Sequence, residues 1–237
     1  MKRSEVNEII KSGDAFIRSF GFTLPPFAYW SPDDFRGRAE KAPRVAEAQL
    51  GWDVTDFGLG RFNQLGLLLF TLRNGHAEDL AQGGGMVYAE KLMILRRDQV
   101  CVMHRHMVKA EDIINRGGGV LAMQLYASDA SGKLDETADV EVMSDGELKH
   151  LPAGGELRLA PGESVTLLPG IWHSFWAEQG DVLAGEVSTV NDDLTDNAFK
   201  DPIGRFADIE EDEPPVHLLV SDYDTYLKDD AKAAGTG

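Results

Sequence analysis

The spacing of apolar positions divides the chain into a helical beginning and a long β-rich remainder. Apolar residues recur at helical spacing over residues 3–20, which predicts an amphipathic helix. Pro25 and Pro26 end this pattern, and Ser31 followed by Pro32 is typical of the start of a second helix. We therefore expect a helical extension at the N-terminus, over residues 1–55.

From about Phe62 the pattern changes to short apolar or alternating runs, bounded by Gly, Asp, Asn or Pro. The run QLGLLLFTLR predicts a strand that ends in a tight turn at Asn74-Gly75. Several strands at this spacing are typical of a sandwich or a barrel. We therefore expect an all-β domain over residues 56–227, followed by a flexible tail over residues 228–237.

The composition of the chain limits which partners it can bind and where in the cell it is expected. The formal net charge of −17 argues against nucleic acid and against an anionic membrane surface, because both require a surplus of Lys and Arg. Cys101 is the single cysteine, so no disulfide can form within the chain. The sequence shows neither a secretory signal pattern nor a membrane-length apolar run, and we expect a cytoplasmic protein.

Two segments carry candidate chemistry. His104 and His106 are two residues apart, so on a strand their side chains point to the same face, and Glu111 follows after a turn. Two imidazoles and a carboxylate suit a first-row divalent ion such as manganese, iron, cobalt, nickel or zinc. A later segment, APGESVTLLPGIWHSFW, places His173 shortly after Gly170, where a tight turn would direct it inward.

Together these segments resemble the two motifs of the cupin family, which consists of metal-binding jelly-roll barrels. The matching positions are His104, His106, Glu111 and Gly118 in the first motif, and Gly162, Gly170 and His173 in the second. Asp98 replaces the opening glycine of the first motif, Pro169 is displaced by one residue, and Ala177 replaces the closing asparagine of the second. The resemblance implies a cupin barrel whose metal ligands are His104, His106, Glu111 and His173.

More specific runs resemble the D-lyxose isomerase family of cupin sugar isomerases, over about residues 3–227. They are LPPFAYWSP, VYAEKLMILRRDQ, MHRHMVKAEDIINRGGG and GRFADIEEDEPP. The resemblance implies a metal-dependent isomerase that interconverts D-lyxose and D-xylulose, with D-mannose and D-fructose as a second pair. The implied cofactor is one divalent ion, with Mn2+ preferred over Zn2+, Co2+, Ni2+ and Fe2+.

Aldose–ketose isomerisation also needs an acid/base group that moves a proton between neighbouring carbons. Lys109 shares the face of Glu111, and a neighbouring cation should lower the pKa of its ammonium. Glu210 and Glu211 lie in an acidic run that we expect to form a wall of the sugar pocket, where one of them would act as the base. The further sugar-binding candidates are Lys91, Gln124, Glu186, Asp193 and Arg205.

The sequence also predicts the partner and the oligomeric state, and it leaves two alternative functions open. The partner should be a small monosaccharide, and apolar surface on the helices and strands predicts a homodimer. One alternative is a sugar-binding cupin without activity, which predicts a lost ligand or a fused DNA-binding module. The other is a cupin Fe(II) dioxygenase, which does not explain Lys109 beside the ligands.

Overall fold

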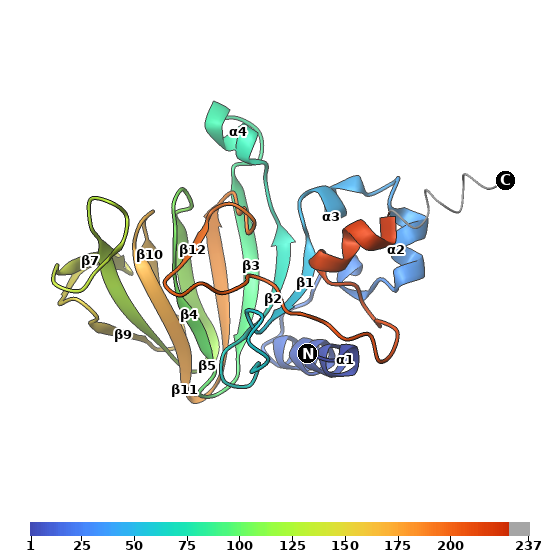
Figure 1. Ribbon diagram of the computed structural model, residues 1–237, viewed down its shortest axis with the longest axis horizontal. Coiled ribbons are helices and arrows are strands. Elements are labelled where there is room, and N and C mark those ends of the chain that lie inside the picture. The colour runs from blue at the N-terminus through green and yellow to red at the C-terminus, as the bar shows by residue number, and fades with distance from the viewer. Residues whose placement is uncertain (228–237) are drawn as a thin grey trace.

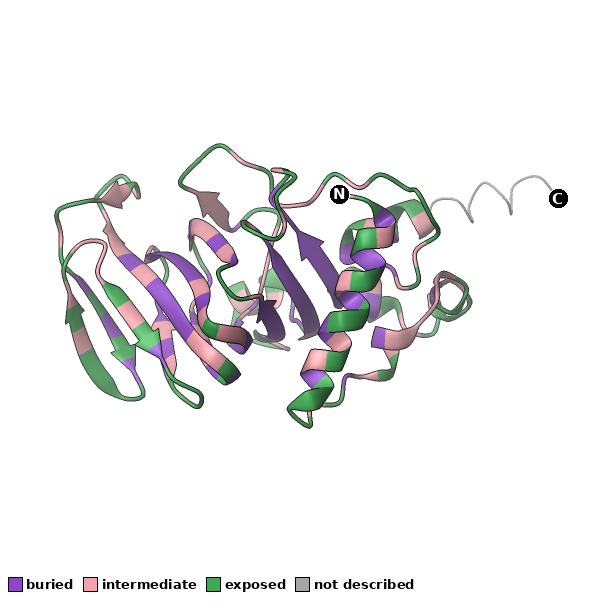
Figure 2. Ribbon diagram, turned by 90° about the horizontal axis from the view of Figure 1, so that it is seen from below, coloured by how far each residue is buried: buried purple, intermediate pink, exposed green. Residues whose placement is uncertain are grey.

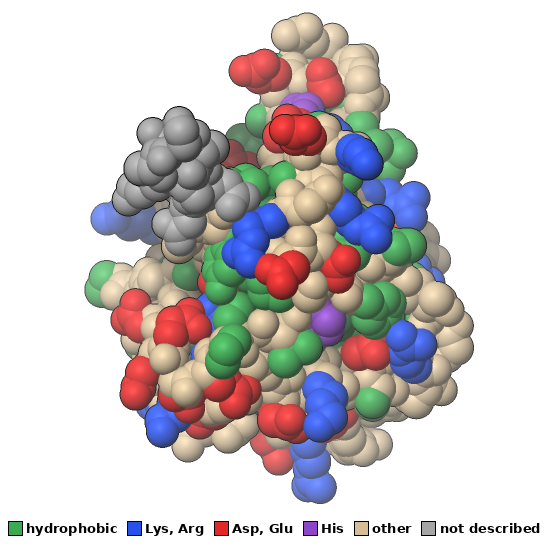
Figure 3. Space-filling model, turned by 90° about the vertical axis from the view of Figure 1, so that its right-hand side faces the viewer, with side chains coloured by type: hydrophobic (Ala, Val, Ile, Leu, Met, Phe, Trp, Pro, Cys, Tyr) green, Lys and Arg blue, Asp and Glu red, His purple; other side chains and the backbone are tan. Residues whose placement is uncertain are grey.

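The computed structural model describes residues 1–227, in which one large antiparallel sheet carries helices against one end (Figure 1). This architecture confirms the predicted all-β fold with a helical N-terminal extension. None of the helices in this part of the chain is long and apolar enough to cross a membrane. Acidic side chains gather on the helix-covered end of the molecule (Figure 3). The predicted tail over residues 228–237 lies outside the described residues.

The N-terminal elements form as their sequence predicts. They are α1 (Arg3–Ser19), the 3₁₀ turn η1 (Pro26–Tyr29), α2 (Pro32–Arg38) and α3 (Pro43–Glu47). Ser31 caps α2, since its hydroxyl accepts a hydrogen bond from the Asp34 backbone N–H at 3.1 Å. Helix α1 packs Val6, Ile10 and Ile17 against the outer face of the sheet. Purple segments recur along this helix in Figure 2, where buried residues alternate with exposed ones. Burial of these apolar side chains attaches the extension to the sheet.

The strands pair antiparallel throughout the sheet. Their bounds are β1 (Gly51–Thr55), β2 (Leu67–Arg73), β3 (Tyr88–Leu95), β4 (Val100–His106), β5 (Glu111–Ser128), β6 (Leu134–Asp135), β7 (Val140–Ser144), β8 (Glu147–Leu151), β9 (Glu156–Leu159), β10 (Ser164–Leu167), β11 (Trp172–Thr189) and β12 (Asn197–Phe199). The main path runs β1-β2-β3-β11-β5-β10-β7-β8, while β4 joins β11 and β12, and β6 and β9 join β5. The predicted domain boundary at residue 55 stays a prediction. Strand β1 ends at that residue and pairs with β2 of the sheet.

The predicted tight turn at Asn74-Gly75 is wrong. The connection from β2 to β3 continues to Tyr88 and contains a short helix, α4 (Ala77–Gln82), which stands away from the body of the molecule (Figure 1). Asn74 is instead buried, and its side-chain amide donates to Asn191 O at 2.9 Å and to Ala48 O at 3.3 Å. The residue therefore joins two distant segments rather than reversing the chain.

Strands β5 and β11 are the longest and pair along most of their length. Their register shifts between Glu178 and Val182, where Gln179 and Gly180 have φ values of 63° and 146°. The glycine run in β5 lies opposite this bulge, and a Cβ atom on Gly119 would lie 2.3 Å from the Glu178 carbonyl oxygen. The glycines after the histidine motif thus permit a close backbone approach.

Two apolar cores lie on opposite faces of the sheet. The inner core fills the barrel and includes Leu95, Leu121, Met123 and Val165, whereas the outer core lies between the sheet and α1 (Figure 2). Side-chain alternation assigns each strand residue to one core or the other. Charged residues that point into the barrel therefore stand beside the inner core, and they define the site described next.

Candidate active site

A cavity inside the barrel collects most of the predicted site residues. Its lining includes apolar side chains such as Phe57, Leu69, Met93 and Phe175. The predicted residues that line it are Lys91, His104, His106, Lys109, Glu111, His173, Glu186, Asp193 and Arg205. These residues come from β3, β4, β5, β11 and the segments that follow β4, β11 and β12. The folded chain therefore brings together groups that are far apart in sequence.

The three predicted histidines meet at one point. His104 pairs with His173 across β4 and β11, and one ring nitrogen from each of these two and from His106 lies within 4.8 Å of the others. The Nδ1 atoms of His104 and His173 lie 2.8 Å from Val102 O and 3.1 Å from Ile171 O. A carbonyl partner requires Nδ1 to carry the proton, so Nε2 is left as the lone-pair donor.

Glu111, at the start of β5, lies next to two of these histidines. Its Oε1 lies 3.5 Å from His106 Nε2 and 3.2 Å from His173 Nε2. This buried oxygen has no hydrogen-bond partner among residues 1–227. A buried carboxylate oxygen without a donor is costly, so its position next to ring nitrogens calls for a cation.

The protonation states also suit a cation. Burial, together with the nearby His173, lowers the pKa of His104 to about 3, and burial also holds the pKa of His106 well below its ordinary value. Burial alone would raise the pKa of Glu111, but Lys109 and His106 outweigh it and hold that pKa well below its ordinary value. Neutral imidazoles and an ionised carboxylate are the forms that bind a divalent metal. His104, His106, Glu111 and His173 could therefore hold one ion.

Lys109 lies between two carboxylates in the same cavity. Its Nζ is 2.6 Å from Glu111 Oε2 and 2.8 Å from Glu186 Oε1, and all three side chains are buried. Burial opposes the charged form of Lys109, yet Glu111 and Glu186 raise the pKa above its ordinary value. The sequence argument did not consider these two carboxylates, and the expected lowering of this pKa by a bound cation stays a prediction.

The charges continue beyond Lys109 as an alternating row. Lys91 Nζ lies 3.8 Å from Glu186 Oε1 and 3.6 Å from Asp193 Oδ1. Arg205 Nη2 then lies 3.0 Å from Asp193 Oδ2 and 2.7 Å from Asp53 Oδ2. We call these seven residues the cavity row; they are Glu111, Lys109, Glu186, Lys91, Asp193, Arg205 and Asp53. All of these residues except Asp53 line the cavity, and they offer it both hydrogen-bond donors and acceptors, the groups that fix a polyhydroxylated ligand.

Sequence reasoning missed two polar residues at this site. Asn191 Oδ1 accepts hydrogen bonds from Lys91 Nζ and, at 3.4 Å, from Lys109 Nζ. Asp53 lies within β1, where its side chain is 1% exposed. A charged residue in the run GWDVT was the available signal for Asp53, whereas Asn191 follows a strand as many surface residues do.

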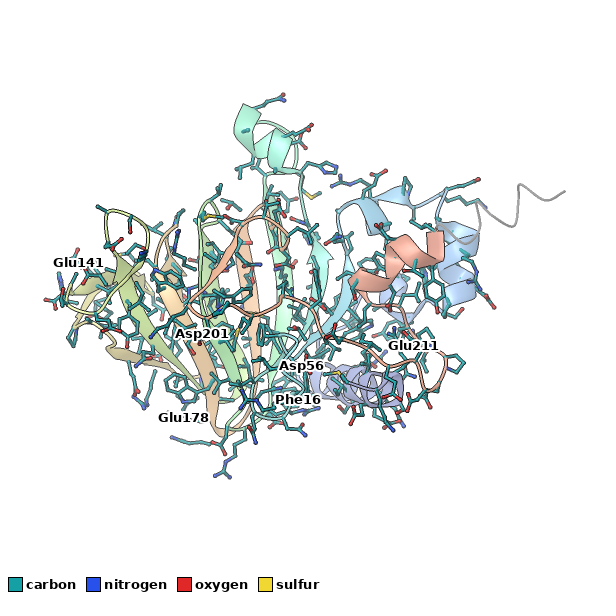
Figure 4. The ribbon with its side chains drawn as sticks, viewed as in Figure 1. Phe16, Asp56, Glu141, Glu178, Asp201 and Glu211 are labelled. Carbon is teal, nitrogen blue, oxygen red and sulfur yellow. The ribbon has the colours of Figure 1, made fainter. Side chains whose placement is uncertain are left out.

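Three predicted residues lie elsewhere. Glu211 pairs with Arg3 of α1 and lies on the helix-covered end of the molecule in Figure 4. The backbone of Glu210 forms hydrogen bonds with the backbones of Arg3 and Met1. These glutamates do not form a wall of the cavity, because α1 holds their segment on the outside of the sheet. Gln124 donates to Gly154 O at 3.2 Å, on the face of β5 opposite Met123 of the inner core.

Comparison with known proteins places this cavity in context. The D-lyxose isomerase family matches residues 1–223. The D-lyxose/D-mannose isomerase of Serratia proteamaculans is 50% identical over 227 residues, covering 94% of this chain and 98% of that protein. The protein of the same name from Escherichia coli O157:H7 is 46% identical over 226 residues, with coverage of 94% and 98%.

Solved structures support the fold. The L-ribose isomerase of Acinetobacter sp. DL28 superposes with a TM-score of 0.60 at 15% identity, over 89% of this chain and 98% of that one. The L-ribose isomerase of Cellulomonas parahominis gives a TM-score of 0.58 at 16% identity, over the same shares. These neighbours have cupin-type barrels, which confirms the predicted fold. With the family matched along nearly the whole chain, the protein belongs to the D-lyxose isomerase family and is a sugar ketol-isomerase.

Proposed function

We propose that the protein is a metal-dependent aldose–ketose isomerase that interconverts D-lyxose and D-xylulose, and also D-mannose and D-fructose. The observation that carries this proposal is the group of three buried histidines with the unpartnered Oε1 of Glu111, next to the Lys109–Glu186 pair. The names of the two relatives support the choice of sugars.

The metal site belongs to the proposal. His104, His106, Glu111 and His173 would hold one divalent ion, and Mn2+ is the ion we expect, with Zn2+, Co2+, Ni2+ and Fe2+ suited to the same ligands. When bound, such an ion polarises the sugar carbonyl and stabilises the negative charge of the enediolate. The fit rests on the buried Glu111 oxygen and on the free Nε2 atoms of His104 and His173.

The proton carrier in this proposal is Glu186. Its Oε1 accepts hydrogen bonds from Lys109 Nζ at 2.8 Å and from Ser188 Oγ at 3.1 Å. Two donors on Oε1 leave Oε2 to remove the proton from C2 of the aldose and return it to C1 of the enediol. Glu111 would serve as a ligand, and Glu210 and Glu211 lie outside the barrel. Asp193 also lines the cavity, but its two oxygens pair with Lys91 and Arg205, so Glu186 is the carboxylate with an oxygen left for this step.

Lys109 takes a complementary role. Because the two carboxylates raise its pKa, it stays an ammonium at neutral pH and donates hydrogen bonds rather than accepting protons from carbon. A charged donor in a buried cavity stabilises developing negative charge on the sugar oxygens. Lys109 would therefore stabilise the enediolate while it holds Glu186 in place.

A sugar panel tests the proposed function. The purified protein is stripped with a chelator, reloaded with Mn2+, and offered D-lyxose, D-mannose, D-ribose and D-xylose while ketose formation is followed. We expect turnover of D-lyxose and D-mannose, no turnover by the stripped protein, and recovery when Mn2+ is restored. Full activity after stripping would remove the metal from the proposal. Absence of turnover with every sugar would favour a sugar-binding cupin.

A homodimer and a cytoplasmic location also stay proposals. Several apolar side chains on outward-facing strand positions are exposed, among them Tyr88, Met143 and Val187. Burial of such side chains against a second copy would remove apolar surface from water. Light scattering at micromolar concentration tests this directly, since a monomeric mass would exclude the dimer.

A further inference from the structure

Asp53 is the charged residue of strand β1, at an inward position. Its neighbours Trp52 and Val54 belong to the outer core against α1, so alternation turns Asp53 towards the barrel interior. It is 1% exposed. Burial of a carboxylate at such a position costs free energy unless a cation is held against it.

The cation is Arg205, which reaches into the barrel from the segment after β12. Strand β1 holds this residue at two points, because Thr55 Oγ1 donates to Arg205 O at 2.6 Å and Asp53 Oδ2 lies 2.7 Å from Arg205 Nη2. Asp193 Oδ2 contacts the same Nη2 at 3.0 Å. The guanidinium is thus fixed through one of its terminal nitrogens by two carboxylates.

The other terminal nitrogen of Arg205, Nη1, has no such partner in the described part of the chain. Arg205 Nη1 is buried and has no hydrogen-bond partner among residues 1–227, although Arg205 lines the cavity together with the histidines. Leaving a charged donor buried and unpaired is expensive. The backbone of Arg205 is already held by Thr55, and an apolar pair could fill the space of Asp53 and Arg205 without loss of stability. The pair therefore calls for a role other than attaching this segment.

We propose that Asp53 is a positioning residue that sets the sugar affinity of the site through Arg205. In this inference, which rests on the proposed isomerase function, Arg205 Nη1 donates a hydrogen bond to a hydroxyl of the bound sugar. Asp53 and Asp193 occupy Nη2 and so turn Nη1 towards the ligand. Asp53 itself touches neither the sugar nor the reacting carbons.

A double-mutant cycle tests this role. Michaelis parameters for D-lyxose with saturating Mn2+ are measured for the wild type, Asp53→Asn, Arg205→Met and the double variant. We expect Asp53→Asn to raise KM about tenfold with kcat changed by less than about threefold, as befits loss of a hydrogen bond to a charged donor. The double variant should match Arg205→Met alone, since Asp53 has nothing to position once the guanidinium is gone.

Two results would overturn the inference. One is a KM for Asp53→Asn that stays within about twofold of wild type, and the other is a double variant whose losses multiply. If Asp53→Asn does not fold, Asp53→Glu keeps the charge but displaces the guanidinium, and its KM should still rise; an unchanged KM would assign the carboxylate to folding alone. A wild type that turns over no sugar rejects the proposed function and this inference with it.

The chain offers a matched control in Asp222→Asn. This change removes a carboxylate from a different buried arginine, Arg3, whose Nη2 lies 2.9 Å from Asp222 Oδ1 outside the cavity. It should lower the temperature of unfolding while KM for D-lyxose stays at the wild-type value. A rise in KM equal to that of Asp53→Asn would show that loss of a buried carboxylate acts through general destabilisation, and would overturn the inference.

Discussion

The molecule contains two charge clusters built around buried arginines or lysines, and they differ in how completely they are paired. The first, which we call the clasp, is Arg3 with Glu211 and Asp222. Arg3 Nε and Nη2 bond to the two oxygens of Glu211 at 2.9 and 2.6 Å, and Nη1 and Nη2 bond to those of Asp222 at 3.0 and 2.9 Å. The nitrogens of this guanidinium are therefore all satisfied within the protein.

The cavity row is paired only in part. Glu111 Oε1 and Arg205 Nη1 are buried without hydrogen-bond partners among residues 1–227. The clasp joins α1 to residues 211–222. The cavity row, by contrast, lies around the cavity inside the barrel. We infer from the difference that the fully paired cluster attaches α1, while the unpaired buried atoms of Glu111 and Arg205 lie where the proposed ligands would bind.

The largest effect should follow from His104→Ala. Loss of this imidazole removes a ligand from the centre of the cavity, so bound metal and turnover should both fall to near background. Metal analysis of the purified variant and the D-lyxose assay measure the two losses. His150→Ala is the control, because this histidine pairs with Glu141 on the surface and is 64% exposed. Full metal occupancy in His104→Ala would exclude the assigned ligand set.

Lys109→Met should separate chemistry from metal binding. Loss of the ammonium next to Glu186 should reduce kcat roughly 10²–10⁴-fold, the range for a positioned acid/base or charged donor. Metal content should change little, because Lys109 is not a ligand. If metal and turnover disappear together, Lys109 supports the structure of the site, and if neither changes, the proton transfer needs no help from it.

Arg3→Met should affect stability alone and so test the other side of the comparison. Removal of the guanidinium leaves Asp222 partly buried without its partner, and we expect a loss of about 2–3 kcal/mol in the free energy of unfolding, since Glu211 is half exposed and regains water. Urea unfolding measures the loss. A fall in kcat in the folded variant would show that the clasp also serves the cavity.

Low pH should reduce the stability of the folded protein, and the pKa of His104 sets the sign of this effect. Its pKa is about 3 in the folded protein against an ordinary value of 6.5, so between these values the unfolded chain binds a proton that the folded chain does not. Stability is therefore full above about pH 6.5 and falls towards pH 3, by about 1.4 kcal/mol per pH unit for this residue. Urea unfolding of chelator-treated protein from pH 7 to 5 measures the slope, and His104→Gln should flatten it.

Much of the site could be predicted from the sequence because it depends on local spacing. His104 and His106 share a face by strand alternation, Lys109 and Glu111 follow close behind, and His173 comes after a recognisable turn. The fold class follows from repeated short strands. The helix α1 and the cap at Ser31 also depend on neighbouring residues alone.

The rest depends on contacts between distant segments. The acidic run at Glu210 and Glu211 has the composition of a pocket wall, and only the position of Arg3 shows that it lies on the outside. The role of Asp53 depends on its contact with Arg205, a residue that is distant in sequence. The pKa of Lys109 likewise depends on Glu186, a residue whose placement requires the pairing of β11 with β3.

The bulge in β11 has a consequence for insertions and deletions. His173 and Glu186 lie on one strand an odd number of residues apart, so in a regular strand they would point to opposite faces. Both line the cavity, because the irregular pairing around Gln179 and Gly180 reverses the phase of the strand between them. Deleting one residue at the bulge would leave His173 in place and turn Glu186 outwards. A family member that changes length there must restore the phase elsewhere or lose its carboxylate.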